Sequence, residues 1–430
     1  MMLLVTFLSM FGFMLVGLEV FASMAAAGIL YLIISGNAPL NLVAANMIQG
    51  MQSFTLLAIP FFILVGELMN VTGMTKKLID LIQYFLAPVK GGLAHAAITM
   101  DVILSCVSGS APANAAACAT VLVPAMKKEK YPDDFAAAIN CVSSVVGPII
   151  PPSILMVVLA TLLNMSVGRL FMGGIIAGLM MSGSLYIVAA IKVRNMDLSV
   201  DPSKYRQKPL YKVFLEALPG LMAPMIIIVG VLTGVATITE ISILACSFVM
   251  FVGFFITRTL SPRKLLQAFK KAILFASAIM ALFGVLGTFT FFMAVERVDV
   301  MLSNFIFGME MSPWMFLLMV NIFFLVIGMI MDALPLMTIF MPVFMPVAMS
   351  LGIDPIHFGV LVVVNLSIGL CTPPIGGLLF VVQKISGVPI DRIVKQTIPF
   401  VAAMLVVLII ITYIPQVTLF LPNLIFGGGA

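Results

Sequence analysis

The stretches GPIIPP at 147–152 and GLCTPP at 369–374 each place a glycine and a Pro-Pro pair inside a long apolar run. Proline has no backbone N–H and disfavours the helical conformation in the residue before it. Neither stretch can therefore continue as a regular helix. We predict two interrupted helices, at 134–163 and 356–383.

Such interruptions leave backbone carbonyls without their intrahelical partners. The carbonyls concerned are those of Gly147, Ile150, Gly369 and Thr372. A bare carbonyl in hydrocarbon costs on the order of several kcal/mol, so a break persists only where protein, water or an ion satisfies it. Unwound backbone can supply a dehydrated Na+ with oxygen ligands without placing a full negative charge in the membrane. A single break is often only a kink, but a matched pair points to ion binding.

The composition is that of an integral membrane protein. Of 430 residues, 62% are apolar and 9% are charged, and the mean hydropathy is +1.23. No soluble domain could bury that much apolar surface, so lipid must cover it. The chain has only two histidines, so catalysis by an imidazole group is disfavoured. The net charge is +5, and its Lys and Arg residues lie in short loops. They therefore indicate orientation in the membrane rather than nucleic-acid binding.

Apolar segments of spanning length recur along the whole chain. They lie at 2–18, 20–36, 52–70, 134–163, 170–191, 214–235, 238–257, 268–294, 356–383 and 396–424. Two further apolar regions, 92–126 and 313–350, are broken in the middle and predict re-entrant hairpins. An amphipathic segment at 73–87 should lie along the membrane interface.

Basic residues indicate the orientation of these segments. Lys and Arg cluster in five short loops, which all fall on one side if both broken regions are hairpins. That side is the cytoplasm by the positive-inside rule, and both chain termini are then periplasmic. The first hairpin opens to the cytoplasm and the second to the outside. The hairpin and interrupted helix thus form an inverted repeat, which is typical of a transport site near the bilayer midplane.

Four motifs occur in the order expected for one known family. They are SGSAPANA at 108–115, GPIIPPS at 147–153, GMIMDALP at 328–335 and NLSIGLCTPPIG at 365–376. With these motifs, the chain resembles the large membrane subunit of tripartite ATP-independent periplasmic (TRAP) transporters over essentially its whole length. The resemblance implies an elevator-type ion transporter, in which a transport domain carries solute and Na+ past a fixed scaffold.

The same resemblance implies partners, solutes and a location. The partners would be a small four-helix membrane subunit and a periplasmic substrate-binding protein. The solutes would be small organic anions such as dicarboxylates or sialic acids. The location would be the bacterial inner membrane, and neither an enzymatic activity nor a nucleic-acid partner is expected.

The domain organisation follows from the repeat. We predict N-terminal scaffold spans and an interfacial arm in 1–91, a first transport repeat in 92–191 and a second in 313–395. The loop, further scaffold spans and a second arm occupy 192–312, and a C-terminal span occupies 396–430.

Candidate ligands come from the hairpin tips and the breaks, chiefly as backbone carbonyls and hydroxyls. For the first Na+ site we predict Ser105, Ser108, Gly147 and Ile150. For the second we predict Gly328, Asp332, Gly369 and Thr372. For the solute we predict contacts with Ser110, Asn114, Pro152, Asp332 and Thr372.

Several of these residues have a structural alternative. Asp332, an intramembrane carboxylate, is a functional candidate by default, but it could instead cap the hairpin tip. Asp101 is more readily explained by capping or interhelical hydrogen bonding than by coupling to an ion or solute. Asn114 could bind a solute or cap the returning helix. Glu67 is expected to be exposed at the interface.

No basic residue stands at either hairpin tip. An anionic solute would then be held by hydroxyls, amides, helix dipoles and bound Na+. A second transport hypothesis is a stand-alone symporter or antiporter that needs no binding protein. A membrane-embedded enzyme is disfavoured because the sequence lacks HExxH, a GxGD pair and a P-loop.

Overall fold

The computed structural model describes residues 2–35, 41–198, 205–298, 300–301, 304, 308 and 311–427. All regular structure within these ranges is helical, which confirms the predicted all-α class. The predicted periplasmic ends, residue 1 and residues 428–430, lie outside the described ranges.

The helices follow one another through short connections. The first half contains α1 (Met2–Leu15), α2 (Val20–Ser35), α3 (Asn41–Met51), η1 (Phe54–Leu57), α4 (Ala58–Thr72), α5 (Met74–Leu86), α6 (Gly92–Ser108), α7 (Ala111–Lys128), α8 (Asp133–Ser143), η2 (Ser144–Val146), α9 (Ile154–Leu163) and α10 (Val167–Arg194). The second half contains α11 (Leu210–Thr233), α12 (Ile238–Phe251), η4 (Val252–Ile256), α13 (Pro262–Val295), α15 (Pro313–Gly328), α16 (Ala333–Ser350), α17 (Pro355–Gly369), α18 (Gly377–Ser386), α19 (Ile390–Tyr413) and α20 (Gln416–Phe426).

Many of these helices suit a lipid environment. In the described part of the chain, seven helices are long and apolar enough to cross a membrane. They are η1 with α4, α10, α11, α12 with η4, α13, α16 and α19. The chain is therefore a multi-pass membrane protein, as predicted.

The first predicted hairpin consists of α6 and α7, which are joined through Gly109 and Ser110. Gly109 has a φ of +58°, a conformation that glycine adopts without strain. Pro112 stands in the first turn of α7, where a missing N–H costs no hydrogen bond. Next along the chain, α8 and its short extension η2 are followed by an irregular stretch before α9 begins at Ile154. The predicted interruption at 147–152 is thus present.

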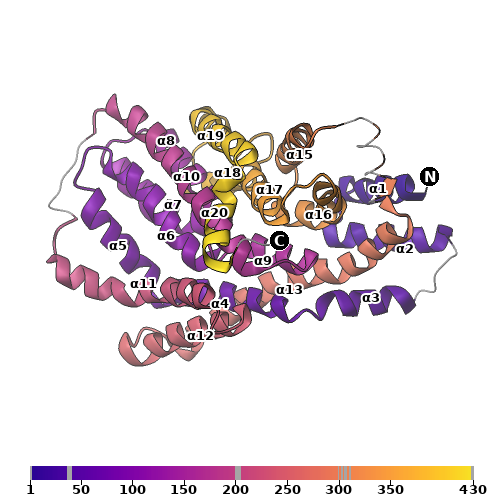
Figure 1. Cartoon of the computed structure of the whole chain (residues 1–430). Coiled ribbons are helices and arrows are strands. Elements are labelled where there is room, and N and C mark those ends of the chain that lie inside the picture. Colours follow the sequence, from indigo (N-terminus) through magenta and orange to yellow (C-terminus); the bar gives the residue numbers. More distant parts are fainter. Residues whose placement is uncertain are drawn as a thin grey trace.

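The second hairpin and interruption have the same order. Helix α15 ends at Gly328 and α16 begins at Ala333, while α17 ends at Gly369 and α18 begins at Gly377. Every residue of α17 from Ile356 onward is buried. A helix that is apolar on all sides belongs inside the protein, and α17 indeed packs against α10, α15 and α16 (Figure 1).

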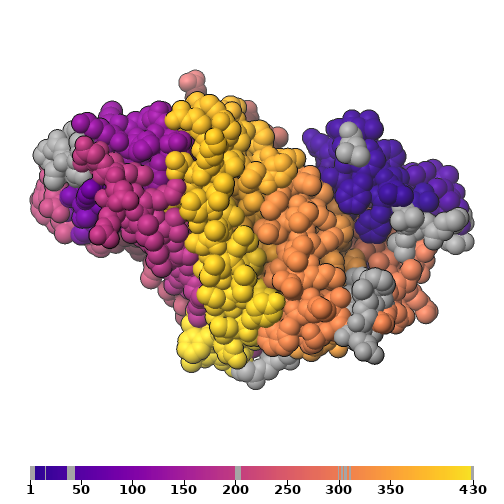
Figure 2. Space-filling view, turned by 90° about the horizontal axis from the view of Figure 1, so that it is seen from above, coloured from indigo at the N-terminus to yellow at the C-terminus, as the bar shows by residue number. Residues whose placement is uncertain are grey.

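The molecule is elongated, with the hairpins and interrupted helices between two outer groups of helices. Figure 1 shows α5 and α11 at one end, α1, α2 and α3 at the other, and α13 running along the underside. Figure 2 shows the yellow C-terminal helices beside the orange second hairpin region, with the indigo N-terminal helices at the far end. The long α13 packs against α2, α3 and α4, and so connects the N-terminal helices to the centre.

Two details differ from the sequence prediction. Helix α3 lies between predicted spans and was not expected; glycines allow its close contact with α13, because a Cβ on Gly50 would lie 2.5 Å from the carbonyl oxygen of Phe283. The segment 396–424, predicted as one span, is two helices. Ile414 precedes Pro415 and has left the helical conformation, with φ −124° and ψ 80°, as a residue before proline prefers.

Candidate transport site

The tip of the first hairpin rests directly on the first interruption. A Cβ placed on Gly109 would lie 2.3 Å from the carbonyl oxygen of Pro152, and one on Gly147 would lie 3.1 Å from the backbone nitrogen of Ala111. The approach of Gly109 leaves no room for a side chain, and that of Gly147 is tighter than most Cβ contacts. The two elements, separate in the sequence, therefore form one unit.

The second tip meets the second interruption in the same manner. A Cβ on Gly369 would lie 2.9 Å from the carbonyl oxygen of Gly328. Beyond the break, the backbone N–H of Ile375 donates to the carbonyl of Met329 over 3.1 Å. Each hairpin tip thus contacts the break of the interrupted helix that follows it in the chain.

A hydrogen-bonded network joins the two arms of the first hairpin. The Asn114 side-chain amide donates to Ser105 Oγ over 3.2 Å, and Ser108 Oγ donates to Asn114 Oδ1 over 2.5 Å. Ser105 Oγ donates in turn to the carbonyl of Asp101. Asn114 is 1% exposed, so its side chain holds the hairpin together from within. It neither caps α7 nor lines the two cavities described below.

Asp101 occupies the interior of the same unit. Its side chain is fully buried and accepts hydrogen bonds from Ser143 Oγ and, over 3.3 Å, from Cys118 Sγ. These partners come from α8 and α7. The interhelical hydrogen bonding predicted as one of the more probable roles of Asp101 is present.

Free carbonyls occur at the first interruption as predicted. Among the described residues, none donates a hydrogen bond to the carbonyls of Gly147 or Ile150. The neighbouring carbonyl of Pro148 accepts one from Ser153 Oγ, which also caps α9. Two backbone oxygens thus remain available at the first interruption.

At the second interruption the prediction was half correct. The carbonyl of Gly369 accepts a hydrogen bond from the Thr372 N–H over 3.1 Å, because the chain makes a tight turn before the proline pair. The carbonyl of Thr372 itself receives none within the described ranges. Thr372 Oγ1 donates to the carbonyl of Ile368 over 2.7 Å.

Two adjoining cavities lie where the hairpin tips come together. The larger, of about 530 Å³, is lined by Ile63, Gly66, Glu67, Asn70, Ser108, Ser110, Pro112, Ala113, Ile154, Lys271, Leu274, Phe275 and Ala278. The smaller, of about 80 Å³, is lined by Gly109, Ser110, Ala111, Pro112, Pro148, Ile154, Leu155, Phe275, Asp332, Ala333, Leu334 and Leu370. Ser110 lines both cavities, and Asp332 faces the smaller one, so these predicted solute contacts from the two hairpins lie close together.

The remaining predicted residues lie behind this surface. Those that line neither cavity are Ser105, Asn114, Gly147, Ile150, Pro152, Gly328, Gly369 and Thr372. Pro152 is buried under the first hairpin tip. Of the predicted ion ligands, only Ser108 and Asp332 line a cavity, and of the predicted solute contacts, only Ser110 and Asp332 do.

Asp332 has the capping role that was its alternative. Its Oδ1 accepts a hydrogen bond from the backbone N–H of Ala333 over 2.7 Å, at the N-terminus of α16. A carboxylate at this position also interacts favourably with the helix dipole. Only Oδ1 of Asp332 accepts this capping hydrogen bond. The other carboxylate oxygen can therefore still contact a ligand in the cavity.

Sequence reasoning missed a charged pair on the opposite wall. Glu67 on α4 lies 3.3 Å from Lys271 Nζ on α13, and the Glu67 side chain is 23% exposed rather than free at the interface as predicted. Both residues line the larger cavity. The available signal was a lone carboxylate in the apolar run 52–70.

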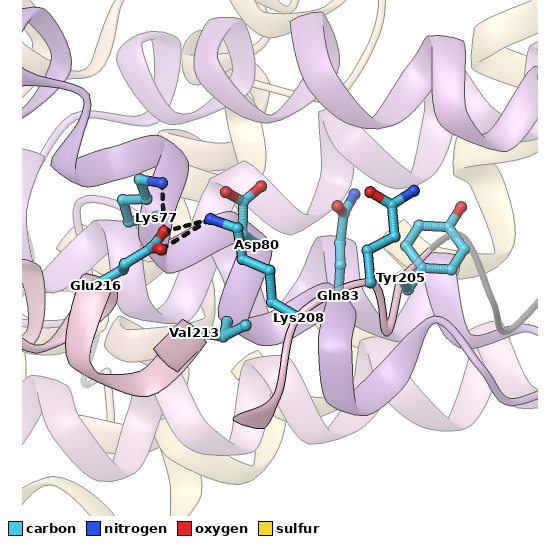
Figure 3. A pocket seen from close by; sticks show the side chains of 8 residues that line it. Lys77, Asp80, Gln83, Tyr205, Lys208, Val213 and Glu216 are labelled. Carbon is cyan, nitrogen blue, oxygen red and sulfur yellow. Dashed lines mark hydrogen bonds and ion pairs between the residues drawn. The ribbon is translucent and has the colours of Figure 1, made fainter. Parts of the chain in front are cut away.

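A second polar pocket is occupied by its own ion pairs. Glu216 on α11 binds Lys77 of α5 over 2.5 Å and Lys208 over 2.8 Å (Figure 3). Asp80 lies beside them. The Lys77 pair joins the amphipathic helix α5 to α11. Both lysines that line this pocket in the described part of the chain are therefore paired with Glu216.

Comparison with known proteins identifies the family. Residues 7–417 match the family described as tripartite ATP-independent periplasmic transporter, DctM component. The chain is 31% identical to the sialic acid TRAP transporter large permease protein SiaM of Vibrio cholerae, over 97% of this chain and 98% of that protein. It is 36% identical to the C4-dicarboxylate TRAP transporter large permease protein DctM of Pseudomonas aeruginosa, over 93% of this chain and 94% of that protein.

A solved structure has a similar fold. The YdaH transporter of Alcanivorax borkumensis superimposes with a TM-score of 0.66, at 14% identity, over 89% of this chain and 90% of that one. This likeness concerns the fold alone. The family match and the full-length sequence matches lead to one conclusion: the chain belongs to the DctM component family, the large permeases of the tripartite ATP-independent periplasmic transporters.

Proposed function

We propose that the chain is a Na+-coupled secondary transporter that imports a small organic anion by an elevator mechanism. The observation that carries this proposal is the meeting of both hairpin tips at adjoining cavities, each tip resting on its own interrupted helix. A solute held there would touch both halves of the repeat. Movement of the two halves as one body would then carry the solute with them.

The inverted repeat supports the elevator mechanism. Hairpin α6–α7 with α8–α9, and hairpin α15–α16 with α17–α18, have the same order, and in each a glycine of the break, Gly147 or Gly369, lies close to the backbone of the hairpin tip. The charge distribution of the sequence orients them oppositely in the membrane. The moving body would comprise these elements, and α4 and α13 would belong to the scaffold.

Two groups of residues are suited to hold Na+ as the coupling ion. In the first, Ser105, Ser108, Gly147 and Ile150 combine two hydroxyls with two free carbonyls at the first interruption. In the second, Gly328, Asp332, Gly369 and Thr372 combine a free carboxylate oxygen with backbone oxygens, although the Gly369 carbonyl is already shared with Thr372. Na+ bound at either place would relieve the cost of burying these oxygens.

The proposed partners follow from the tripartite family. A periplasmic binding protein would deliver the solute, and a small four-helix membrane subunit would complete the complex in the bacterial inner membrane. Relatives named for sialic acid and C4-dicarboxylates suggest a carboxylate as the solute.

Uptake into proteoliposomes tests the proposal. The chain would be reconstituted with its small subunit, and labelled N-acetylneuraminate or succinate would be added with its binding protein. We expect uptake in an inward Na+ gradient and none when K+ replaces Na+. Equal rates in both salts would contradict ion coupling, and equal rates without the binding protein would favour a stand-alone symporter or antiporter.

A further inference from the structure

We propose that Lys271 on α13 binds the carboxylate of the solute in the conformation described here, and that Glu67 on α4 competes with the solute for Lys271. This inference rests on the proposed function and deepens it, because it names a residue that selects an anionic solute. Neither residue belongs to a hairpin or to an interrupted helix. Both therefore act on the solute from the scaffold side.

The position of the pair within the cavity is the first argument. Glu67 and Lys271 are 3.3 Å apart and line the same 530 Å³ cavity as Ser108 and Ser110 of the first hairpin tip. The tip is close to α4, since a Cβ on Gly66 would lie 3.5 Å from the Cα of Ser108. A small solute in contact with Ser110 is thus within the same enclosure as the Lys271 ammonium.

The second argument concerns charge. Lys271 is the one cationic side chain lining either cavity in the described part of the chain, and its side chain is 66% exposed. Glu67 Oε2 is buried and accepts no hydrogen bond from any described residue, so the contact with Lys271 is an ion pair without further support. A charge in a low-dielectric site needs a partner. Lys271 supplies that partner to Glu67, and an incoming carboxylate competes with Glu67 for the Lys271 ammonium.

The third argument is that the contact depends on conformation. Helices α4 and α13 pack against each other, whereas Ser108 and Ser110 sit on the hairpin that the elevator would displace. Lys271 can therefore reach the solute only while the first hairpin tip lies beside α4. By the charge map of the sequence, the first hairpin opens to the cytoplasm, so the pair acts on the cytoplasmic side of the cycle.

Equilibrium binding to the purified chain with its small subunit, in Na+, provides the test. The probes are N-acetylneuraminate and succinate, with succinamide as the uncharged counterpart of succinate. Lys271→Gln should weaken binding of the carboxylate by about tenfold and remove the preference over the amide. Glu67→Gln should tighten carboxylate binding several-fold, because the competitor is gone. Lys271→Arg keeps the charge and should keep the preference.

The matched control is Lys270→Gln, which removes a lysine from the same helix turn but not from either cavity. It should leave binding unchanged. A purely structural ion pair predicts another pattern: both single variants would lower the melting temperature, and neither would alter selectivity for the carboxylate. Suppose that the wild type binds a carboxylate probe and that Lys271→Gln and Glu67→Gln bind it with equal affinity. That result would overturn the inference and leave the proposed function standing. Failure of the wild type to bind either carboxylate in Na+ would overturn the proposed function, and the inference with it.

Discussion

At the scale of single residues, glycine holds each hairpin against its interrupted helix by close contact. The strongest case is Gly109, which combines a left-handed φ of +58° with an approach to the Pro152 carbonyl that leaves no room for a Cβ. An alanine there must both strain the backbone and push the tip away. The tip also carries Ser108 and Ser110, so the contact positions the site.

We therefore expect Gly109→Ala to destabilise the protein by about 2 kcal/mol or more. Thermal unfolding of the purified permease measures this change. Gly183→Ala is the matched control, because a Cβ on Gly183 in α10 meets nothing within 4 Å. It should be neutral or stabilise the helix by roughly 0.4–1 kcal/mol. Equal melting temperatures for the two variants would contradict the docking of the tip.

The candidate site could be predicted from the sequence only where its signals are local. Proline pairs and small residues identified Gly147, Ser110 and Asp332 because each lies within or beside a helix break. Glu67 stood out only as a lone carboxylate in an apolar run, and nothing local indicated Lys271 as its partner, since the two residues meet only through the packing of α4 on α13. The turn bond that occupies the Gly369 carbonyl also depends on the folded path of the chain.

At the scale of elements, the N-terminus of α16 combines stability with function. Asp332 caps this helix through the Ala333 N–H and also faces the smaller cavity. Asparagine is as good an N-cap as aspartate but carries no charge. The two roles of Asp332 can therefore be separated by the choice of substitution.

We expect Asp332→Asn to abolish Na+-dependent uptake while the melting temperature stays near that of the wild type. Asp332→Ala should abolish uptake and also lower stability by about 1 kcal/mol, the typical cost of a lost cap. Transport and unfolding are measured on the same preparations. Wild-type uptake by Asp332→Asn would reduce the residue to a cap.

The hairpins and breaks were predictable as elements, whereas some helices between them were not. Long apolar runs and proline pairs act locally, so α6–α7, α8–α9, α15–α16 and α17–α18 could be anticipated. Helix α3 is short and mildly apolar, and its stability comes from close packing on α13. The turn at Pro415 was not predicted because the residues around it are mostly apolar.

At the scale of the whole molecule, an elevator requires the first hairpin tip to leave α4 during each cycle. The structure offers a direct way to prevent this. A Cβ on Gly66 would lie 3.7 Å from the Cβ of Ser108, which is within the usual Cβ separation of a disulfide. The variant Gly66→Cys with Ser108→Cys should therefore form a bond between the scaffold and the hairpin under oxidising conditions.

We expect the oxidised double variant to stop transport and the reduced form to regain whatever rate its substitutions allow. Uptake is measured before and after reduction of the same proteoliposomes. The single variants, oxidised in parallel, control for the five native cysteines and for the loss of the Ser108 hydroxyl. If the crosslinked protein transports as fast as its reduced form, the tip and α4 do not separate, and solute must cross without displacement of the hairpin. Arrest that reduction reverses would require relative motion between these two elements, because the disulfide restrains little else.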